Sequence, residues 1–117
     1  MKLRKQSRAE VHSMCTEQLT QRVKMGDVLS SPREVDHTAY FRKRSDAATA
    51  AAELSRDGFV VRVARRGLGA FLLEASATTD VEWDTVDSFV DRVYELVTRH
   101  NGVYDGWGGG IVLRSEP

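Results

Sequence analysis

The sequence predicts an α+β fold, in which a four-stranded antiparallel sheet carries two helices on one face and an additional helix precedes it. Apolar residues alternate with polar ones over several short segments, as in half-buried strands, and three other segments repeat apolar residues with helical spacing. With 117 residues, of which 41% are hydrophobic and 29% charged, the chain has the size and composition of one globular domain.

The first segment, residues 1–25, is predicted to be an N-terminal helix that ends before Gly26. Its helical stripe of apolar residues consists of Val11, Met14, Cys15, Leu19 and Val23. Residues 26–34 are predicted to be a connector, because Pro32 disfavours helical backbone at the residue before it. The remaining residues, 35–117, are predicted to form the α+β domain.

A strand and a helix open this domain. The alternating pattern predicts a strand whose inward residues are Val35, His37, Ala39 and Phe41. Ser45 is predicted to cap an alanine-rich helix that ends at Asp57-Gly58. The buried face of that helix is predicted to contain Ala47, Ala51 and Leu54.

A hairpin, a long helix and a last strand follow. Residues 59–64 and 70–78 alternate apolar and polar positions on either side of a glycine-containing turn. Thr79 and Glu82 have the spacing of a capping box, and they precede a strongly amphipathic helix from Trp83 to His100. Residues 103–113 are then predicted to form the fourth strand.

The predicted order after the first helix is strand–helix–strand–strand–helix–strand, which is the ferredoxin-like arrangement. Its sheet has one face covered by helices and one outward face. The outward residues include Tyr40, Val60, Arg62 and Leu72. Because this set is apolar for a surface in water, we expect a partner or, in preference, the N-terminal helix to cover part of it.

Composition and motifs argue against several classes of function. No apolar run approaches the roughly 18 residues of a transmembrane helix, and no secretory signal follows the basic start, so we expect a cytoplasmic protein without membrane contact. The single cysteine, Cys15, and three separated histidines form no metal-ligand pattern. Neither a nucleophile with a nearby base nor a phosphate loop is evident, so no catalytic residue, metal or cofactor is predicted.

Charge is unevenly distributed along the chain, although the formal net charge is zero. Residues 1–66 contain 14 Lys/Arg and 8 Asp/Glu, whereas residues 67–117 contain 3 and 9. The two halves either neutralise each other in the fold or guide a charged partner to the surface. On the long helix, Asp84, Asp87 and Asp91 form an acidic stripe, which is either a solvated face or a docking surface for a basic protein segment.

Direct RNA binding can be assessed from the third strand, where RNA-recognition domains of this topology carry aromatic residues for base stacking. Residues 66–73 retain the arginine and the glycines of that pattern, but Leu68, Ala70 and Leu73 occupy the aromatic positions. Without a stacking platform, only a diffuse basic surface remains. A weak RNA-binding domain is therefore an alternative hypothesis, and direct nucleic-acid binding is not expected.

The segment Tyr104–Gly110 is the least generic in the chain, because four of its seven residues are glycine. It lacks the Lys-Ser/Thr pair of a phosphate loop. We predict a bulged edge strand, in which Asp105-Gly106 sets a bend and Trp107 fills a seam beside Arg33 or the long helix. A small-ligand site around Trp107 is the alternative.

Four segments combine into a wider pattern: Gly26-Asp27, Pro32-Arg33-x-Val35-Asp36-His37, Gly58-Phe59 and Tyr104-Asp105-Gly106-Trp107-Gly108. Over about residues 26–110, this pattern resembles the RraB family, regulators of ribonuclease E activity. The resemblance implies a non-enzymatic ferredoxin-like domain that binds a protein, ribonuclease E or a related ribonuclease, and thereby modulates RNA turnover. The candidate partner-binding residues are Asp84, Asp87, Asp91, Asp105, Trp107 and Arg33.

Overall fold

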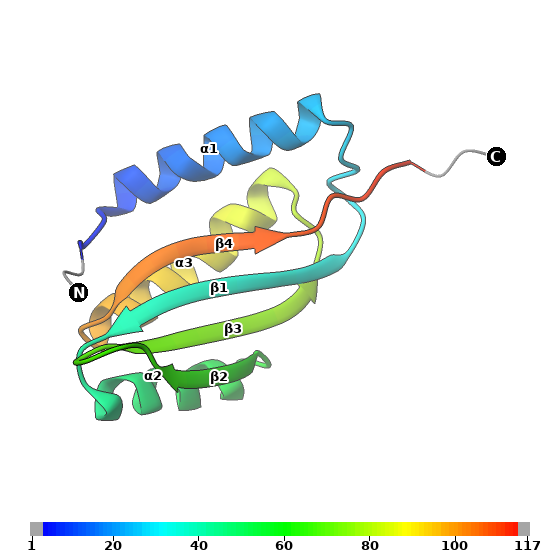
Figure 1. Ribbon diagram of the computed structural model, residues 1–117. Helices are drawn as coiled ribbons and strands as arrows, with labels where there is room; N and C mark the ends of the chain where they lie inside the picture. The colour runs from blue at the N-terminus through cyan, green and yellow to red at the C-terminus, as the bar shows by residue number, and fades with distance from the viewer. Residues whose placement is uncertain (1–3, 115–117) are drawn as a thin grey trace.

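After an N-terminal helix, the chain forms a four-stranded antiparallel sheet with helices on one face (Figure 1). The computed structural model describes residues 4–114. The elements in chain order are α1 (Arg8–Lys24), β1 (Arg33–Phe41), α2 (Arg44–Arg56), β2 (Val60–Arg65), β3 (Phe71–Thr79), α3 (Trp83–Arg99) and β4 (Val103–Gly109). The strand order across the sheet is β2-β3-β1-β4, which confirms the predicted ferredoxin-like arrangement.

The alternation in β1 decides which face of the sheet is buried. Val35, His37, Ala39 and Phe41 are all at most 1% exposed, as the sequence predicts. Strand β1 pairs with β3 along its whole length, from Arg33 opposite Thr79 to Phe41 opposite Phe71. Helices α2 and α3 pack on this inward face, so the hydrophobic core lies between the sheet and the helices (Figure 1).

Strand β4 contains the predicted bulge. Thr38 lies opposite Gly106 and the next residue, Ala39, lies opposite Tyr104, so Asp105 is an extra residue in β4. Gly106 has a φ of 148°, a backbone region that favours glycine. In a regular strand, positions 104 and 107 would face opposite sides of the sheet. Because of the extra residue, Tyr104 and Trp107 both lie in the core.

Helix α1 does not cover the outward face of the sheet, and that expectation was wrong. The helix lies beside the free edge of β4, where Val11, Cys15 and Leu19 join the same core as the inward residues of the sheet (Figure 1). Its fourth buried residue is Arg22. The outward face stays open, and Val60 on that face is 77% exposed.

The starts of two helices differ from the sequence prediction. Ser45 lies inside α2, one residue after its first residue, and therefore does not cap it. Thr79 is still part of β3, where it pairs with Arg33, and therefore cannot cap α3. Instead, the Asp80 carboxylate accepts a hydrogen bond from the backbone N–H of Glu82 at 3.0 Å. Thr79 therefore pairs in the sheet, although its spacing from Glu82 predicted a helix cap.

The connector and the last strand are both shorter than expected. Strand β1 begins at Arg33, two residues before the expected start of the domain, and β4 ends at Gly109 rather than at residue 113. Beyond β4 the chain turns back to the connector, where Leu113 forms an isolated bridge with Asp27. These contacts place residues 112–113 beside the connector that follows α1 (Figure 1).

Candidate protein-binding surface

The two aromatic residues of the Tyr104–Gly110 segment are buried. Tyr104 is 1% exposed, and its hydroxyl oxygen lies 2.9 Å from Nδ1 of His37. The Trp107 ring packs edge-on against Phe89 of α3, with ring centroids 5.3 Å apart, and the Arg22 guanidinium lies 5.0 Å from the Trp107 ring centroid. Trp107 therefore fills a seam beside the long helix, one of the two predicted positions.

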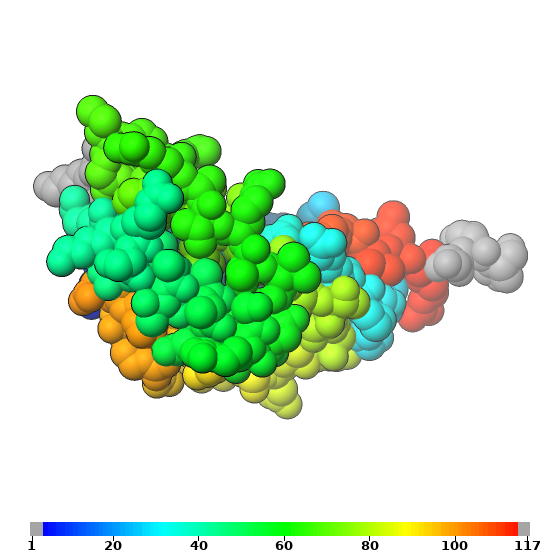
Figure 2. Space-filling view, turned by 90° about the horizontal axis from the view of Figure 1, so that it is seen from below, coloured from blue at the N-terminus to red at the C-terminus, as the bar shows by residue number. Residues whose placement is uncertain are grey.

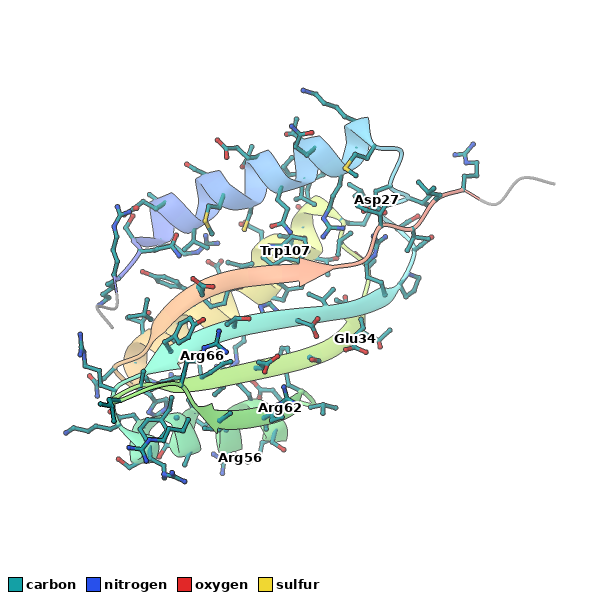
Figure 3. The ribbon with its side chains drawn as sticks, viewed as in Figure 1. Asp27, Glu34, Arg56, Arg62, Arg66 and Trp107 are labelled. Carbon is teal, nitrogen blue, oxygen red and sulfur yellow. The ribbon has the colours of Figure 1, made fainter. Side chains whose placement is uncertain are left out.

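A buried ion cluster fixes the chain that follows β4. The fully buried Asp27 carboxylate accepts hydrogen bonds from Arg33 Nη1 at 2.7 and 2.8 Å and from Arg22 Nη1 at 3.1 Å. The two guanidinium groups also donate to the carbonyls of Gly109 and Gly110. Figure 3 shows Trp107 on the α1 side of β4 and Asp27 just beyond the end of this strand. Arg33 is thus occupied by partners within the chain.

This cluster keeps Asp27 charged. Burial alone would raise the pKa of the Asp27 carboxyl, but hydrogen bonds from Arg33, from the backbone N–H of Val112 and from Arg22 hold the pKa below its ordinary value. Arg22 and Arg33 also donate hydrogen bonds to backbone carbonyls. Few polar atoms of the cluster are therefore left without a hydrogen-bond partner.

Polar side chains of α1 seal the outer edge of β4. Gln6, just before α1, donates to the carbonyls of Tyr104 and Asp105, at 3.1 and 3.3 Å. Gln18 donates to the carbonyl of Trp107 at 3.3 Å, and Arg22 continues the row at Gly109. Because β4 is an edge strand, these carbonyls would otherwise be open to water or to another strand. The β4 edge is therefore already occupied by the chain's own N-terminal region.

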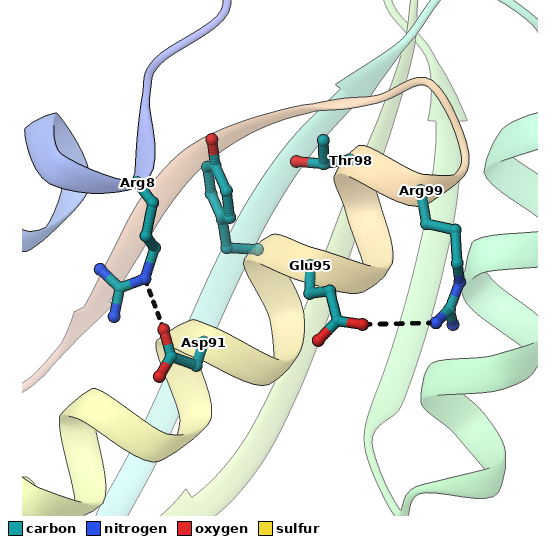
Figure 4. A pocket seen from close by; sticks show the side chains of 6 residues that line it. Arg8, Asp91, Glu95, Thr98 and Arg99 are labelled. Atoms are coloured by element: carbon teal, nitrogen blue, oxygen red, sulfur yellow. Dashed lines mark hydrogen bonds and ion pairs between the residues drawn. The ribbon is translucent and has the colours of Figure 1, made fainter.

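The acidic stripe of α3 is partly neutralised by α1. Arg8 donates to Asp91 at 2.5 Å and to Asp87 at 3.3 Å, and the first of these bonds is drawn in Figure 4. His12 Nδ1 lies 3.7 Å from the Asp87 carboxylate. The side chains of Asp87 and Asp91 are nevertheless 58% and 63% exposed. The uneven charge of the two halves is thus partly explained by pairing within the fold, but both carboxylates remain accessible.

Trp83 and Asp84 lie at the start of this stripe, in the first turn of α3. Trp83 is 46% exposed, and exposed Asp84 forms no ion pair with any residue between 4 and 114. A groove of about 160 Å³ runs between α1 and α3, and its lining includes both residues together with His12, Cys15, Leu19 and Asp87. An exposed aromatic ring, three accessible carboxylates and a groove thus occur together on one surface.

Basic side chains gather around the other edge of the sheet. Arg56, Arg62 and Arg66 lie around α2 and β2 (Figure 3), on the side that the space-filling view shows from below (Figure 2). Arg62 pairs with Glu74 at 2.9 Å, while Leu68 in the β2–β3 turn is 89% exposed. These arginines therefore lie near α2 and β2, whereas the acidic stripe lies on α3 and faces α1. Weak RNA binding by the basic side stays an alternative hypothesis.

The six candidate residues separate into two groups. Asp84, Asp87 and Asp91 share one exposed face of α3, and exposed Asp105 is the extra residue of the β4 bulge. Trp107 and Arg33 are only 9% and 7% exposed, and both are held by contacts inside the fold.

Sequence reasoning missed three residues that matter here: Trp83 as an exposed ring, Arg8 as the partner of the stripe, and Asp27 as the centre of a buried ion cluster. Arg8 and Asp91 are 83 positions apart, so no local pattern signals their contact. For the cluster around Asp27, the sequence offered one signal. Arg22 follows Leu19 by three residues and therefore lies on the buried face of its helix.

Burial lowers the pKa of His37 from 6.5 to about 4, so the folded protein holds this imidazole neutral. Between pH 6.5 and pH 4 the unfolded chain binds a proton at His37 that the folded chain does not. The free energy of unfolding should therefore fall by up to about 3 kcal/mol as the pH is lowered through this window, and should show no such loss above it. Urea unfolding at several pH values between 7.5 and 4 would measure the loss.

A His37→Asn variant provides the control, because its amide oxygen can still accept the Tyr104 hydroxyl hydrogen while the side chain no longer titrates. Its stability should change much less over the same pH range. An equal loss in this variant would mean that other groups cause the pH dependence.

No three His, Cys, Asp or Glu side chains between residues 4 and 114 are grouped so that they could hold a metal ion. Within the same range, every helix is too short or too polar to cross a membrane.

Comparison with known families gives one match. The model of the family described as Regulator of ribonuclease activity B, RraB, matches residues 14–109. This range includes the second half of α1 and all four strands, and it contains all six candidate residues. No curated protein matches the sequence significantly.

Proposed function

The chain belongs to the RraB family of regulators of ribonuclease activity, and on this basis we propose that it has no catalytic activity of its own and acts by binding a ribonuclease. Ribonuclease E, which the sequence resemblance implies, is the first candidate partner, and the cytoplasm is the proposed place of action. In this proposal RNA turnover is altered through a protein–protein contact.

The observation that best supports a binding site is the surface formed by Trp83, Asp84, Asp87 and Asp91, here named the Trp83 surface. Exposed Trp is uncommon on a monomer and is enriched among residues that dominate binding energy at interfaces. The ring lies next to the groove between α1 and α3, so a partner side chain could be buried there.

The chemistry of the Trp83 surface fits a basic protein segment. An arginine side chain can stack on an indole ring while its guanidinium donates to nearby carboxylates. Asp84 forms no ion pair with any described residue. Asp87 pairs with Arg8 but stays exposed, so the surface retains negative charge. Asp105 is a second exposed acidic candidate, whereas Trp107 and Arg33 would act indirectly by holding β4 in place.

Trp83→Ala should weaken binding to purified ribonuclease E by about 30-fold, because a central interface tryptophan typically contributes at least about 2 kcal/mol. Asp84→Lys should weaken binding by about tenfold. The affinity of this variant should also fall less steeply with added salt than that of the wild type. Isothermal titration calorimetry at two salt concentrations would measure both effects. Asp84 is chosen because reversing Asp87 or Asp91 would also break the contact with Arg8.

Glu34→Lys is the matched control, since it makes the same charge change at an exposed position on the outward face of the sheet. It should leave the affinity within about twofold of the wild type. Wild-type affinity in both Trp83 surface variants would remove this surface from the proposal. If binding disappears after nuclease treatment, the contact runs through RNA and the alternative of a weak RNA-binding domain is favoured.

A further inference from the structure

A second site lies over the inward face of the sheet, between α3 and the strands. It is a cavity of about 280 Å³ that is partly open to solvent, and its lining includes Val35, His37, Phe59, Ala77, Ser88 and Phe89. None of these residues belongs to the Trp83 surface. The volume is close to the lower limit of about 300 Å³ for small-molecule pockets, and the walls are mainly apolar.

His37 supplies the pocket with one hydrogen-bonding group. Its ring is held edge-on to both phenylalanines, with centroids 5.7 Å from Phe59 and 5.0 Å from Phe89. Nδ1 is bonded to the Tyr104 hydroxyl, whereas Nε2 has no hydrogen-bond partner between residues 4 and 114. The fully buried, unpartnered side-chain atoms in this range belong to Arg8, Arg22 and Trp107, so Nε2 still reaches accessible space. The cavity is the open space that His37 lines, and we infer that Nε2 faces it.

The tautomer of His37 follows from Tyr104. Burial raises the pKa of the Tyr104 hydroxyl well above its ordinary value, so this group carries its proton, and His37 Nδ1 is its hydrogen-bond partner. If Nδ1 carried the imidazole proton, the buried hydroxyl hydrogen would have no acceptor, which is costly. Nδ1 therefore accepts, the neutral ring carries its proton on Nε2, and the pocket contains one N–H donor on apolar walls.

We propose that this pocket binds a small, uncharged, largely apolar molecule that carries one hydrogen-bond acceptor, such as a carbonyl oxygen, for His37 Nε2–H. The apolar walls provide affinity through buried area, and the single donor selects ligands with an acceptor over otherwise similar hydrocarbons. Occupation of the site would lock α3 onto the sheet, because the pocket contacts both.

The probes are acetophenone, which has a carbonyl acceptor, and ethylbenzene, which has nearly the same shape and none. Titrations of the full chain followed by NMR should show saturable shifts in the signals of Phe59 and Phe89, with acetophenone binding about five- to tenfold tighter. The ¹⁵N signal of His37 Nε2 should move with acetophenone only. In His37→Met, whose thioether can accept the Tyr104 hydroxyl hydrogen but offers no donor to a ligand, the two probes should bind with equal affinity.

Two variants fill the pocket from opposite walls. Ala77→Leu acts from β3 and Ser88→Phe acts from an exposed position of α3, so the second remains informative if the first does not fold. Either folded variant should lose the probe-dependent shifts. The proposal is overturned if the wild type gives no saturable shifts, if filling the pocket leaves them unchanged, or if both probes bind the wild type equally.

Discussion

Asp27→Asn should lower the free energy of unfolding by about 3–5 kcal/mol. The substitution keeps the shape of the side chain but removes the charge that two arginines share, and leaving buried guanidinium groups without a counter-charge has a cost of this size. The Gly109 and Gly110 carbonyls bound by the same arginines should lose their order as well. Urea unfolding followed by circular dichroism at pH 7 would give the change.

The control for this prediction is Asp57→Asn, which breaks an exposed pair with Arg92 whose side chains are 34% and 45% exposed. An exposed pair of this kind contributes about 0–1 kcal/mol, so the control should stay close to the wild type. If the two variants were equally stable, the buried cluster would not be what fixes the end of β4.

Trp107→Ala should destabilise the domain by about 3–5 kcal/mol, the range for removing a large aromatic side chain from a core. The substitution would leave a cavity between β4 and α3 and would remove the ring over which Arg22 lies. Differential scanning calorimetry would show the loss as a lower melting temperature, and hydrogen exchange should increase first at the backbone of β4.

Trp83→Ala serves as the matched tryptophan control, because Trp83 is 46% exposed and its loss creates little or no cavity. It should change stability by less than about 1 kcal/mol while weakening partner binding. A Trp107→Ala protein with wild-type stability that no longer binds the ribonuclease would instead make Trp107 part of the interface.

The candidate site was only partly accessible to sequence reasoning. The helical period placed Asp84, Asp87 and Asp91 on one face of α3, because three- and four-residue spacings define a helix face in any context. The same period began at Trp83 but did not signal that its ring is 46% exposed, because this residue lies in the first turn of α3, where the core does not cover it. The sequence could not show that Asp87 and Asp91 are already paired, because their partner, Arg8, belongs to another helix.

By itself, the sequence determined the order of the elements, the inward residues of β1, the bulge at Asp105-Gly106 and the family. Each of these depends on a local period, a local glycine or a short motif, whose physical cause lies within a few residues. The tertiary structure alone decided that α1 lies along β4 instead of over the open face, that Thr79 extends a strand instead of capping a helix, and that Asp27 is buried between two arginines. These outcomes depend on long-range pairing, in which buried charges and edge carbonyls must find partners wherever the fold brings them together.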